Sequence, residues 1–125
     1  RKFAEPGVAI MGALKDAGAI TPDPFDEHIE WVWFEIWHHE GRRARHGASM
    51  QGPDYTQWHG FYEVAKHFYF KFLPEVRELA EGHPEVEAVI EEALAGPDHA
   101  WLQGMDDETK AEVRAFYKER YDQEQ

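Results

Sequence analysis

The sequence predicts an all-α protein: a helical bundle with two long antiparallel helices and about three shorter ones. Apolar residues recur at intervals of three and four in several segments, which is typical of amphipathic helices. Glycine and proline separate these segments, and no segment alternates apolar and polar residues as a strand would. With 125 residues, 42% of them hydrophobic, the chain can bury a core of its own. We therefore expect residues 1–125 to form a single helical domain.

An extended corner divides the first two predicted helices. The first begins near Pro6, which suits the first turn of a helix, and ends at Gly18. Residues 21–24 read Thr-Pro-Asp-Pro, and each proline disfavours helix at the residue before it. Asp23 or Asp26 is the expected N-cap of a long helix that continues to about residue 48. Its predicted inward stripe is Ile29, Val32, Trp33, Ile36 and Trp37.

Two aromatic residues, Trp31 and Phe34, lie off this stripe, so the long helix is apolar nearly all round. Such a helix is typically covered on more than one side. The alternative is that both rings are half-exposed aromatics of a monomer, which is common on protein surfaces. The sequence leaves both interpretations open.

The second long helix is predicted from Tyr55 to about Ala80. Residues 51–54 read Gln-Gly-Pro-Asp, a turn followed by Asp54 as a possible N-cap. Pro74 is expected to kink the helix, because its ring removes a hydrogen bond and crowds the preceding turn. The predicted inward face consists of Phe61, Ala65, Phe68, Phe72, Val76 and Leu79.

Two shorter helices complete the predicted bundle. One runs from Glu85 to Ala95 and carries a single apolar stripe. The other runs from Asp106 to Tyr121, with acidic residues at its positive N-terminal end. Its expected inward residues are Val113, Phe116 and Tyr117.

Charge and composition exclude several classes of function. The net charge of −12 argues against nucleic acid as a partner, because a phosphate-binding surface is positive. Only residues 41–81, with six Lys or Arg and five Asp or Glu, are locally basic and would attract an anionic ligand. The absence of cysteine excludes disulfides and thiol chemistry. No apolar run approaches the roughly 20 residues of a membrane span, and the first residues lack a signal-peptide core, so the chain reads as a mature or excised piece.

Carboxylates and histidines at helical spacing suggest one metal arrangement. Glu35 and His38 have Glu-x-x-His spacing, while Glu35 with His39 and Glu63 with His67 are pairs four residues apart. Di-metal carboxylate bundles use two Glu-x-x-His motifs plus two further glutamates. Only one such motif is present here, and no other helix offers an inward glutamate. The simpler interpretation is that the glutamates are solvated and the histidines hydrogen-bonded.

Histidines and arginines gather at the end of the first long helix. His39 and His46 are two turns apart, about 10 Å by the 1.5 Å rise per residue, which is too far to share one metal ion. His59 starts the next helix close to them in space. Each could be a satisfied core residue, a ligand of a separate iron centre or a contact for a partner. Arg42, Arg43 and Arg45 either form a solvated C-terminal helix face or pair with carboxylates of a cofactor.

Two runs carry a resemblance to a known family. They are Trp-His-His-Glu-Gly-Arg-Arg-Ala-Arg-His-Gly-Ala at 37–48 and Gly-Pro-Asp-Tyr-Thr-Gln-Trp-His-Gly-Phe-Tyr-Glu at 52–63. Both closely resemble the C-terminal region of octahaem hydroxylamine oxidoreductases and the related hydrazine dehydrogenases. The segments 21–26 and 116–121 fit the same resemblance, which covers most of the chain.

The resemblance implies roles for individual residues. In that family the region supplies distal histidine ligands to c-type haems, and a tyrosine that crosslinks to the catalytic haem of a neighbouring subunit in a trimer. Tyr55 resembles that tyrosine, and His39, His46 and His59 are the candidate axial ligands. Arg42 and Arg43, with their neighbour Arg45, would lie near haem propionates. The implied function is oxidation of a small nitrogen compound, with electrons leaving through haems, in the periplasm or an equivalent compartment.

The chain departs from the family in one respect. It has no cysteine and therefore no Cys-x-x-Cys-His motif, so haem c must be attached elsewhere. The sequence thus predicts either the C-terminal part of a multihaem oxidoreductase or a non-catalytic helical interaction module that has lost the haem domain. The first alternative needs a haem-bearing domain or subunit as partner. Whether the parent oxidises hydroxylamine or hydrazine, or acts as a reductase, stays open.

Overall fold

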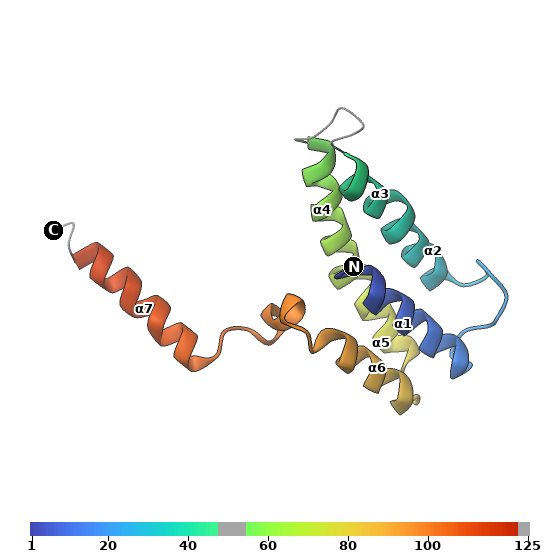
Figure 1. Ribbon diagram of the computed structural model, residues 1–125. Coiled ribbons are helices and arrows are strands. Elements are labelled where there is room, and N and C mark those ends of the chain that lie inside the picture. Colours follow the sequence, from blue (N-terminus) through green and yellow to red (C-terminus); the bar gives the residue numbers. More distant parts are fainter. Residues whose placement is uncertain (48–54, 123–125) are drawn as a thin grey trace. The chain divides into compact units, whose positions relative to one another are not determined.

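A computed structural model describes residues 1–47 and 55–122, apart from the side chains of Tyr55 and Asp122. These residues form helices and no strands, which confirms the all-α prediction (Figure 1). Contacts divide the chain into two compact units, Arg1–Leu94 and Ala95–Gln125, which we describe separately. The single domain expected for residues 1–125 stays a prediction. The predicted turn at 51–54, with its N-cap Asp54, lies outside the described residues.

Two long helices dominate the first unit and run antiparallel, as predicted (Figure 1). The first consists of α2 (His28–Phe34), the π-helical η1 (Glu35–Glu40) and α3 (Gly41–His46). The second consists of α4 (Tyr55–His67), the π-helical η2 (Phe68–Phe72) and α5 (Leu73–Leu79). The shorter helices α1 (Ala4–Asp16) and α6 (Pro84–Leu94) pack against each other beside them.

The sequence predicted a glycine stop at the end of α1 and an N-cap at the start of the long helix. The glycine stop is confirmed, and the N-cap is not. Gly18 follows α1 with φ of 70°, a left-handed conformation that glycine adopts without steric cost. The predicted N-cap of the long helix was wrong, because α2 begins at His28 and no side chain caps it. Asp26 instead accepts a 2.7 Å hydrogen bond from the Thr21 hydroxyl, so it stabilises the preceding corner.

The core lies where α1, α6 and the two long helices meet. Phe68 and Phe72 are fully buried at its centre, and the ring centroids of Trp33 and Phe72 lie 5.4 Å apart. The Trp33 ring packs directly against the backbone of Gly7 in α1. A Cβ at this position would overlap the indole, so the contact requires glycine. The buried apolar residues are Ile10, Met11, Leu14, Ile20, Ile29, Val32, Ile36, Ala44, Val64, Phe68, Phe72, Leu73, Val76, Ala80, Val86, Ile90 and Leu94.

The two π-helical segments change which residues face inward. A π turn closes i→i+5 hydrogen bonds and adds about one residue to a turn. Ile36, Glu40 and Ala44 therefore follow one another on the buried face, and Trp37 is 43% exposed. In the second long helix Phe61 is 57% exposed, while Val64 and His67 are buried. The predicted inward positions of Trp37 and Phe61 were thus wrong.

The proline in the second long helix lies next to an irregular segment, and the predicted kink at Pro74 stays a prediction. Pro74 lies in the first turn of α5, where its missing N–H would otherwise bond to a carbonyl of η2. The π-helical segment η2 ends immediately before α5, so the irregularity lies on the N-terminal side of the proline. Phe68 and Phe72, at the two ends of η2, remain in the core.

The backbones of α3 and α4 approach each other closely at two glycines. A Cβ on Gly60 would lie 2.5 Å from the backbone nitrogen of Ala44. A Cβ on Gly47 would lie 2.6 Å from the Cα of Gln57. Real Cβ atoms do not occupy such positions, so glycine is required at both contacts. The two glycines therefore let α3 and α4 lie closer together than a larger residue at either position would allow.

The second unit contains the 3₁₀ helix η3 (Pro97–Gln103) and α7 (Asp107–Asp122). Asp106 caps α7, because its side chain accepts hydrogen bonds from the Thr109 backbone N–H at 2.7 Å and from the Thr109 hydroxyl at 3.0 Å. The predicted inward face of this helix was wrong, because its aromatic residues are exposed. Those exposed apolar and aromatic residues are Val113, Phe116, Tyr117 and Tyr121.

Gly60→Ala should lower the free energy of unfolding by about 1–3 kcal/mol, because the new methyl group must push α4 away from α3. Gly12→Ala is the matched control, since a Cβ there meets no atom within 4 Å and the residue also lies in a helix. It should raise stability by up to about 1 kcal/mol through helix propensity. Urea unfolding measures both values, and equal effects of the two substitutions would contradict the close contact.

The N-cap of α7 should make its helicity depend on pH. Hydrogen bonds from Thr109 hold the pKa of the Asp106 carboxyl below its ordinary value. A lowered folded-state pKa means that the cap stabilises α7 above the ordinary pKa and is lost as the pH falls below about 4. Carbon chemical shifts of residues 107–112 should report this loss. Asp106→Ser should retain the helix without that titration, whereas Asp106→Ala should lose helicity at every pH.

Candidate functional site

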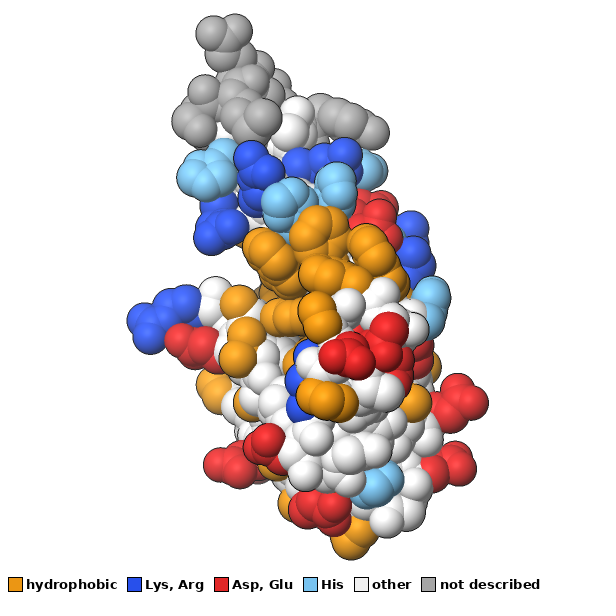
Figure 2. Space-filling model, turned by 90° about the vertical axis from the view of Figure 1, so that its right-hand side faces the viewer, with side chains coloured by type: hydrophobic (Ala, Val, Ile, Leu, Met, Phe, Trp, Pro, Cys, Tyr) orange, Lys and Arg blue, Asp and Glu red, His pale blue; other side chains and the backbone are white. Residues whose placement is uncertain are grey.

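The predicted site residues lie at the end of the first long helix and the start of the second. His39, His46, Arg42 and Arg43 are exposed, and His59 is half-buried. Figure 2 shows histidine and basic side chains gathered in a band beside a hydrophobic patch. Tyr55 is the first residue of α4, but its side chain lies outside the described part of the structure. The prediction that Tyr55 crosslinks to a haem therefore stays a prediction.

A continuous row of aromatic rings runs along α2 and η1 towards this basic band. We call it the aromatic ladder, and it consists of Phe25, Trp31, Phe34, Trp37, His38 and His39. Successive ring centroids lie between 4.5 and 6.1 Å apart, and the His38 ring stacks on Phe34. Trp31 is 52% exposed. Trp31 and Phe34, the two aromatics off the predicted inward stripe, are thus both part of the aromatic ladder. In the chain by itself Trp31 is exposed and Phe34 is half-buried, and both interpretations that the sequence offered stay open.

A second group of exposed rings lies on α4 and η2. Trp58 stacks on Tyr62 with centroids 5.9 Å apart, and the Lys66 ammonium lies 5.6 Å from the Tyr62 ring centre. Phe61 and Phe70 are also exposed. Indole and phenol rings combine a large apolar area with a polar atom, which is why they are common at protein interfaces. Both long helices therefore present aromatic surface to the outside.

The predicted ligands and arginines have different local contacts. His39 contacts the rings of Phe34 and His38. Arg42 lies 3.4 Å from the Nε2 atom of His38, and Arg45 donates a 3.1 Å hydrogen bond to the Gly41 carbonyl. His59 Nε2 is 3.7 Å from Glu63 Oε1.

These contacts separate the predicted ligands. His39 and His46 are accessible from outside the chain, whereas His59 is directed towards a carboxylate of its own helix. Arg43 approaches the buried carboxylate of Glu40 at 3.6 Å.

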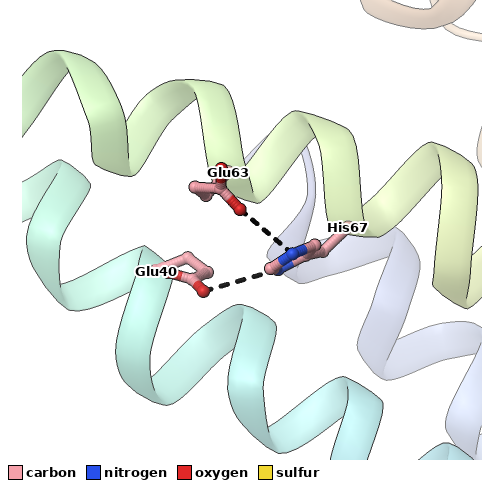
Figure 3. A group of neighbouring side chains, drawn as sticks. All are labelled: Glu40, Glu63 and His67. Atoms are coloured by element: carbon pink, nitrogen blue, oxygen red, sulfur yellow. Dashed lines mark ion pairs between the residues drawn. The ribbon is translucent and has the colours of Figure 1, made fainter.

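A buried cluster of two carboxylates and one imidazole lies between the two long helices, behind the exposed surface. His67 Nε2 is 3.0 Å from Glu63 Oε2, and His67 Nδ1 is 3.4 Å from Glu40 Oε1. Figure 3 shows Glu40 reaching across from the first long helix to the imidazole, which Glu63 approaches from its own helix. One ligand atom from each residue can be chosen so that all three lie within 4.8 Å of one another.

The cluster is shielded from solvent, and its hydrogen bonds are incomplete. Glu40 is 4% exposed and His67 is 8% exposed. Glu40 Oε2 and His67 Nδ1 are buried atoms without a hydrogen-bond partner. The closest cation to Glu40 Oε2 is Arg43 at 3.6 Å, which is beyond hydrogen-bonding distance. Lys66 and His59 approach the other oxygen of Glu63, at 3.5 and 3.7 Å.

The sequence identified two of the three residues of this cluster. The pairing of Glu63 with His67 was predicted from their four-residue spacing and is confirmed. Glu40 was not predicted. It lies four residues after Ile36, so the helical spacing of the inward stripe could have identified it as a polar residue on a buried face. Glu35, whose spacing from His38 and His39 suggested a metal arrangement, is exposed, in agreement with the simpler interpretation that it is solvated. Among the described residues, none of these three belongs to a metal-sized cluster.

The described residues offer one groove beside the aromatic ladder, of about 400 Å³, between α2 and the second long helix. It is lined by His28, Trp31, Val32, Glu35, Lys71 and Glu75. None of the predicted haem-contacting residues lines it. His28 Nδ1 contacts the Glu75 carboxylate across the groove at 2.9 Å.

No protein-family model, curated protein or solved structure matches the chain. Among the described helices, none has the length and apolar character required to cross a membrane.

Removing the buried carboxylate of the cluster should be costly. Glu40→Ala should lower the free energy of unfolding by about 1–3 kcal/mol, because it removes the contact of Glu40 with the buried His67, leaving Glu63 as its carboxylate partner, and opens a cavity between the helices. Glu35→Ala, on the same π turn but exposed, should change stability by less than about 0.5 kcal/mol. Parallel urea titrations compare the two variants. A Glu40→Ala protein as stable as the wild type would show that the buried contact contributes nothing.

Proposed function

We propose that the chain is a helical docking part of a multihaem oxidoreductase that resembles hydroxylamine oxidoreductase. The exposed aromatic ladder, leading into the basic band of histidines and arginines, carries this proposal. In this proposal, a haem-bearing domain or subunit covers the aromatic ladder, and its haem irons are bound by His39 and His46 at the edge of the ladder. The parent enzyme would oxidise a small nitrogen compound in the periplasm or an equivalent compartment, as a trimer by resemblance.

The aromatic ladder supports a docking role on physical grounds. Trp31 and Trp37 are exposed and both contact the half-buried Phe34, so they form a patch rather than scattered residues. Contiguous exposed aromatic surface is typical of interaction sites and costs free energy when left in water. The net charge of the chain is strongly negative, and the adjacent basic band is the place where anionic haem propionates would be favoured.

The individual residues fit a haem held by another polypeptide to different degrees. His39 and His46 are exposed, so an iron atom outside the chain could reach an imidazole nitrogen. His59 fits less well, because its Nε2 faces Glu63. Arg42 is exposed and suited to a propionate, whereas Arg43 is turned towards Glu40. Tyr55 is proposed as the crosslinking residue on the resemblance alone. The haem, when bound, would supply the redox chemistry, and this chain would supply ligation and burial.

The competing proposal is a non-catalytic helical interaction module. It uses the same aromatic ladder but needs no haem-bearing partner, and the chain's lack of cysteine is compatible with it. The two proposals differ in the identity of the occupant of the ladder. An oxidoreductase part requires a partner segment with Cys-x-x-Cys-His motifs, whereas an interaction module does not.

Purification of the tagged chain from its native cells should yield a covalently continuous or tightly bound polypeptide that carries Cys-x-x-Cys-His motifs and haem absorbance. Replacing Trp31 and Trp37 together by Ala should reduce the co-purified haem at least tenfold, because central aromatic residues dominate interface energies. Replacing Phe116 and Tyr117 by Ala is the matched control, since these rings are equally exposed but lie on α7. A colourless protein without any haem-bearing partner would contradict the proposal.

The same complex separates the residue roles. His39→Ala should convert one low-spin haem to a high-spin form, visible in its absorption and electron paramagnetic resonance spectra, while His83→Ala should not. Tyr55→Phe should abolish the covalent link between the peptide and haem in mass spectra of proteolytic digests. Unchanged spectra in His39→Ala and His46→Ala would remove these histidines from the proposed ligand set without affecting the docking role.

A further inference from the structure

We propose that Glu40, Glu63 and His67 bind a divalent transition-metal ion between the two long helices. The proposal rests on the geometry of the buried cluster and does not depend on the proposed haem partner. It concerns one ion and three protein ligands, and so differs from the di-metal arrangement based on Glu35 and His38.

The donor atoms match the preferences of Zn²⁺, Mn²⁺ and related ions. Two carboxylates and one imidazole provide oxygen and nitrogen ligands, the combination found in many mononuclear sites with three protein ligands. One ligand atom from each residue can be chosen so that all three lie within 4.8 Å of one another. Because Glu40 and Glu63 contact different nitrogens of His67, side-chain rotation must accompany binding of one ion by all three. A site with three protein ligands keeps a position for water or another small ligand.

The charge and burial of the cluster favour a cation. Two carboxylates face one imidazole in a region where Glu40 and His67 are almost fully buried. Among the described residues, Arg43, Lys66 and His59 approach the two carboxylates, each at 3.5 Å or more. A divalent ion bound by the three ligands would place positive charge directly at the two carboxylates.

The incomplete hydrogen bonding distinguishes a metal site from a simple ion pair. A protonated His67 would donate from both ring nitrogens, but Nδ1 lies 3.4 Å from Glu40 Oε1 and is not hydrogen-bonded. Glu40 Oε2 is also without a hydrogen-bond partner, although Glu40 is only 4% exposed. Figure 3 shows the carboxylate of Glu40 directed towards the imidazole of His67. Buried polar atoms usually find partners, and ligation would provide one for each of these two atoms.

The scaffold holds the three ligands on rigid elements. Glu63 and His67 are four residues apart on α4, so they share a helix face. Glu40 is the last residue of the π-helical η1, and π turns occur frequently at functional sites. Gly60, one turn before Glu63, lets α4 approach the backbone of Ala44, which lies one turn after Glu40, so the two helices that carry the ligands are closely packed beside the cluster.

Titration of the EDTA-treated full chain with Zn²⁺ in a calorimeter tests the proposal. We expect one ion per chain, release of protons to the buffer, and a rise in melting temperature with Zn²⁺ concentration. Glu40→Gln, Glu63→Gln and His67→Gln should each weaken binding at least tenfold. His28→Gln is the matched control, since His28 also faces a glutamate, at 2.9 Å, but in an exposed pair. Its affinity for Zn²⁺ should equal that of the wild type.

A second measurement does not depend on the folding of any variant. In the wild-type protein, the ring nitrogen signals of His67 should shift on addition of Zn²⁺, and Co²⁺ should produce visible absorption bands in the same stoichiometry. Binding that persists in Glu40→Gln, or ring shifts confined to the half-buried His38 and the exposed His39 and His46, would overturn the proposal. So would the absence of any stoichiometric binding, which would identify the cluster as a proton-bridged ion pair.

Discussion

The close contact between α3 and α4 is the constraint on which the rest of the first unit depends. Gly60 and Gly47 allow the two backbones to approach until a Cβ at either position would meet backbone atoms of the other helix. Ala44, which Gly60 contacts, lies one turn after Glu40, and Glu63 lies one turn after Gly60. The buried polar cluster therefore follows this close contact along the two helices, with His67 one turn further on.

The π-helical segment η1 has two effects that arise from one change in backbone geometry. Its wider turn keeps Ile36 and Glu40 on the buried side and rotates Trp37 outwards. The same turn brings His38 and His39 into contact with Phe34, which extends the aromatic ladder to the basic band. Regular α-helical spacing had predicted Trp37 to be inward, but it is exposed, whereas Glu40, four residues after Ile36, is buried. The exposed surface and the buried cluster therefore have a common origin.

Local signals in the sequence predicted the fold, and the failures came from effects that depend on tertiary packing. Helical spacing and the glycine and proline breaks correctly located the helices, including the left-handed Gly18. The spacing rule assumes regular α-helix, so it failed after Ile36, where the π turn changes the register. It also placed Val113 and Phe116 of α7 inside because their spacing is amphipathic. In the structure both are exposed, so an apolar stripe indicates a preference for burial but does not supply a partner.

The cluster and the aromatic ladder are joined through the backbone of η1, and this connects their energetics. Trp37, His38 and His39 face outwards, while Glu40, the next residue, faces inwards. A partner that packs on the ladder therefore contacts the same π turn that positions the buried carboxylate. An ion held by Glu40 and His67 would restrict the π turn and so reduce the entropy lost when the ladder is covered.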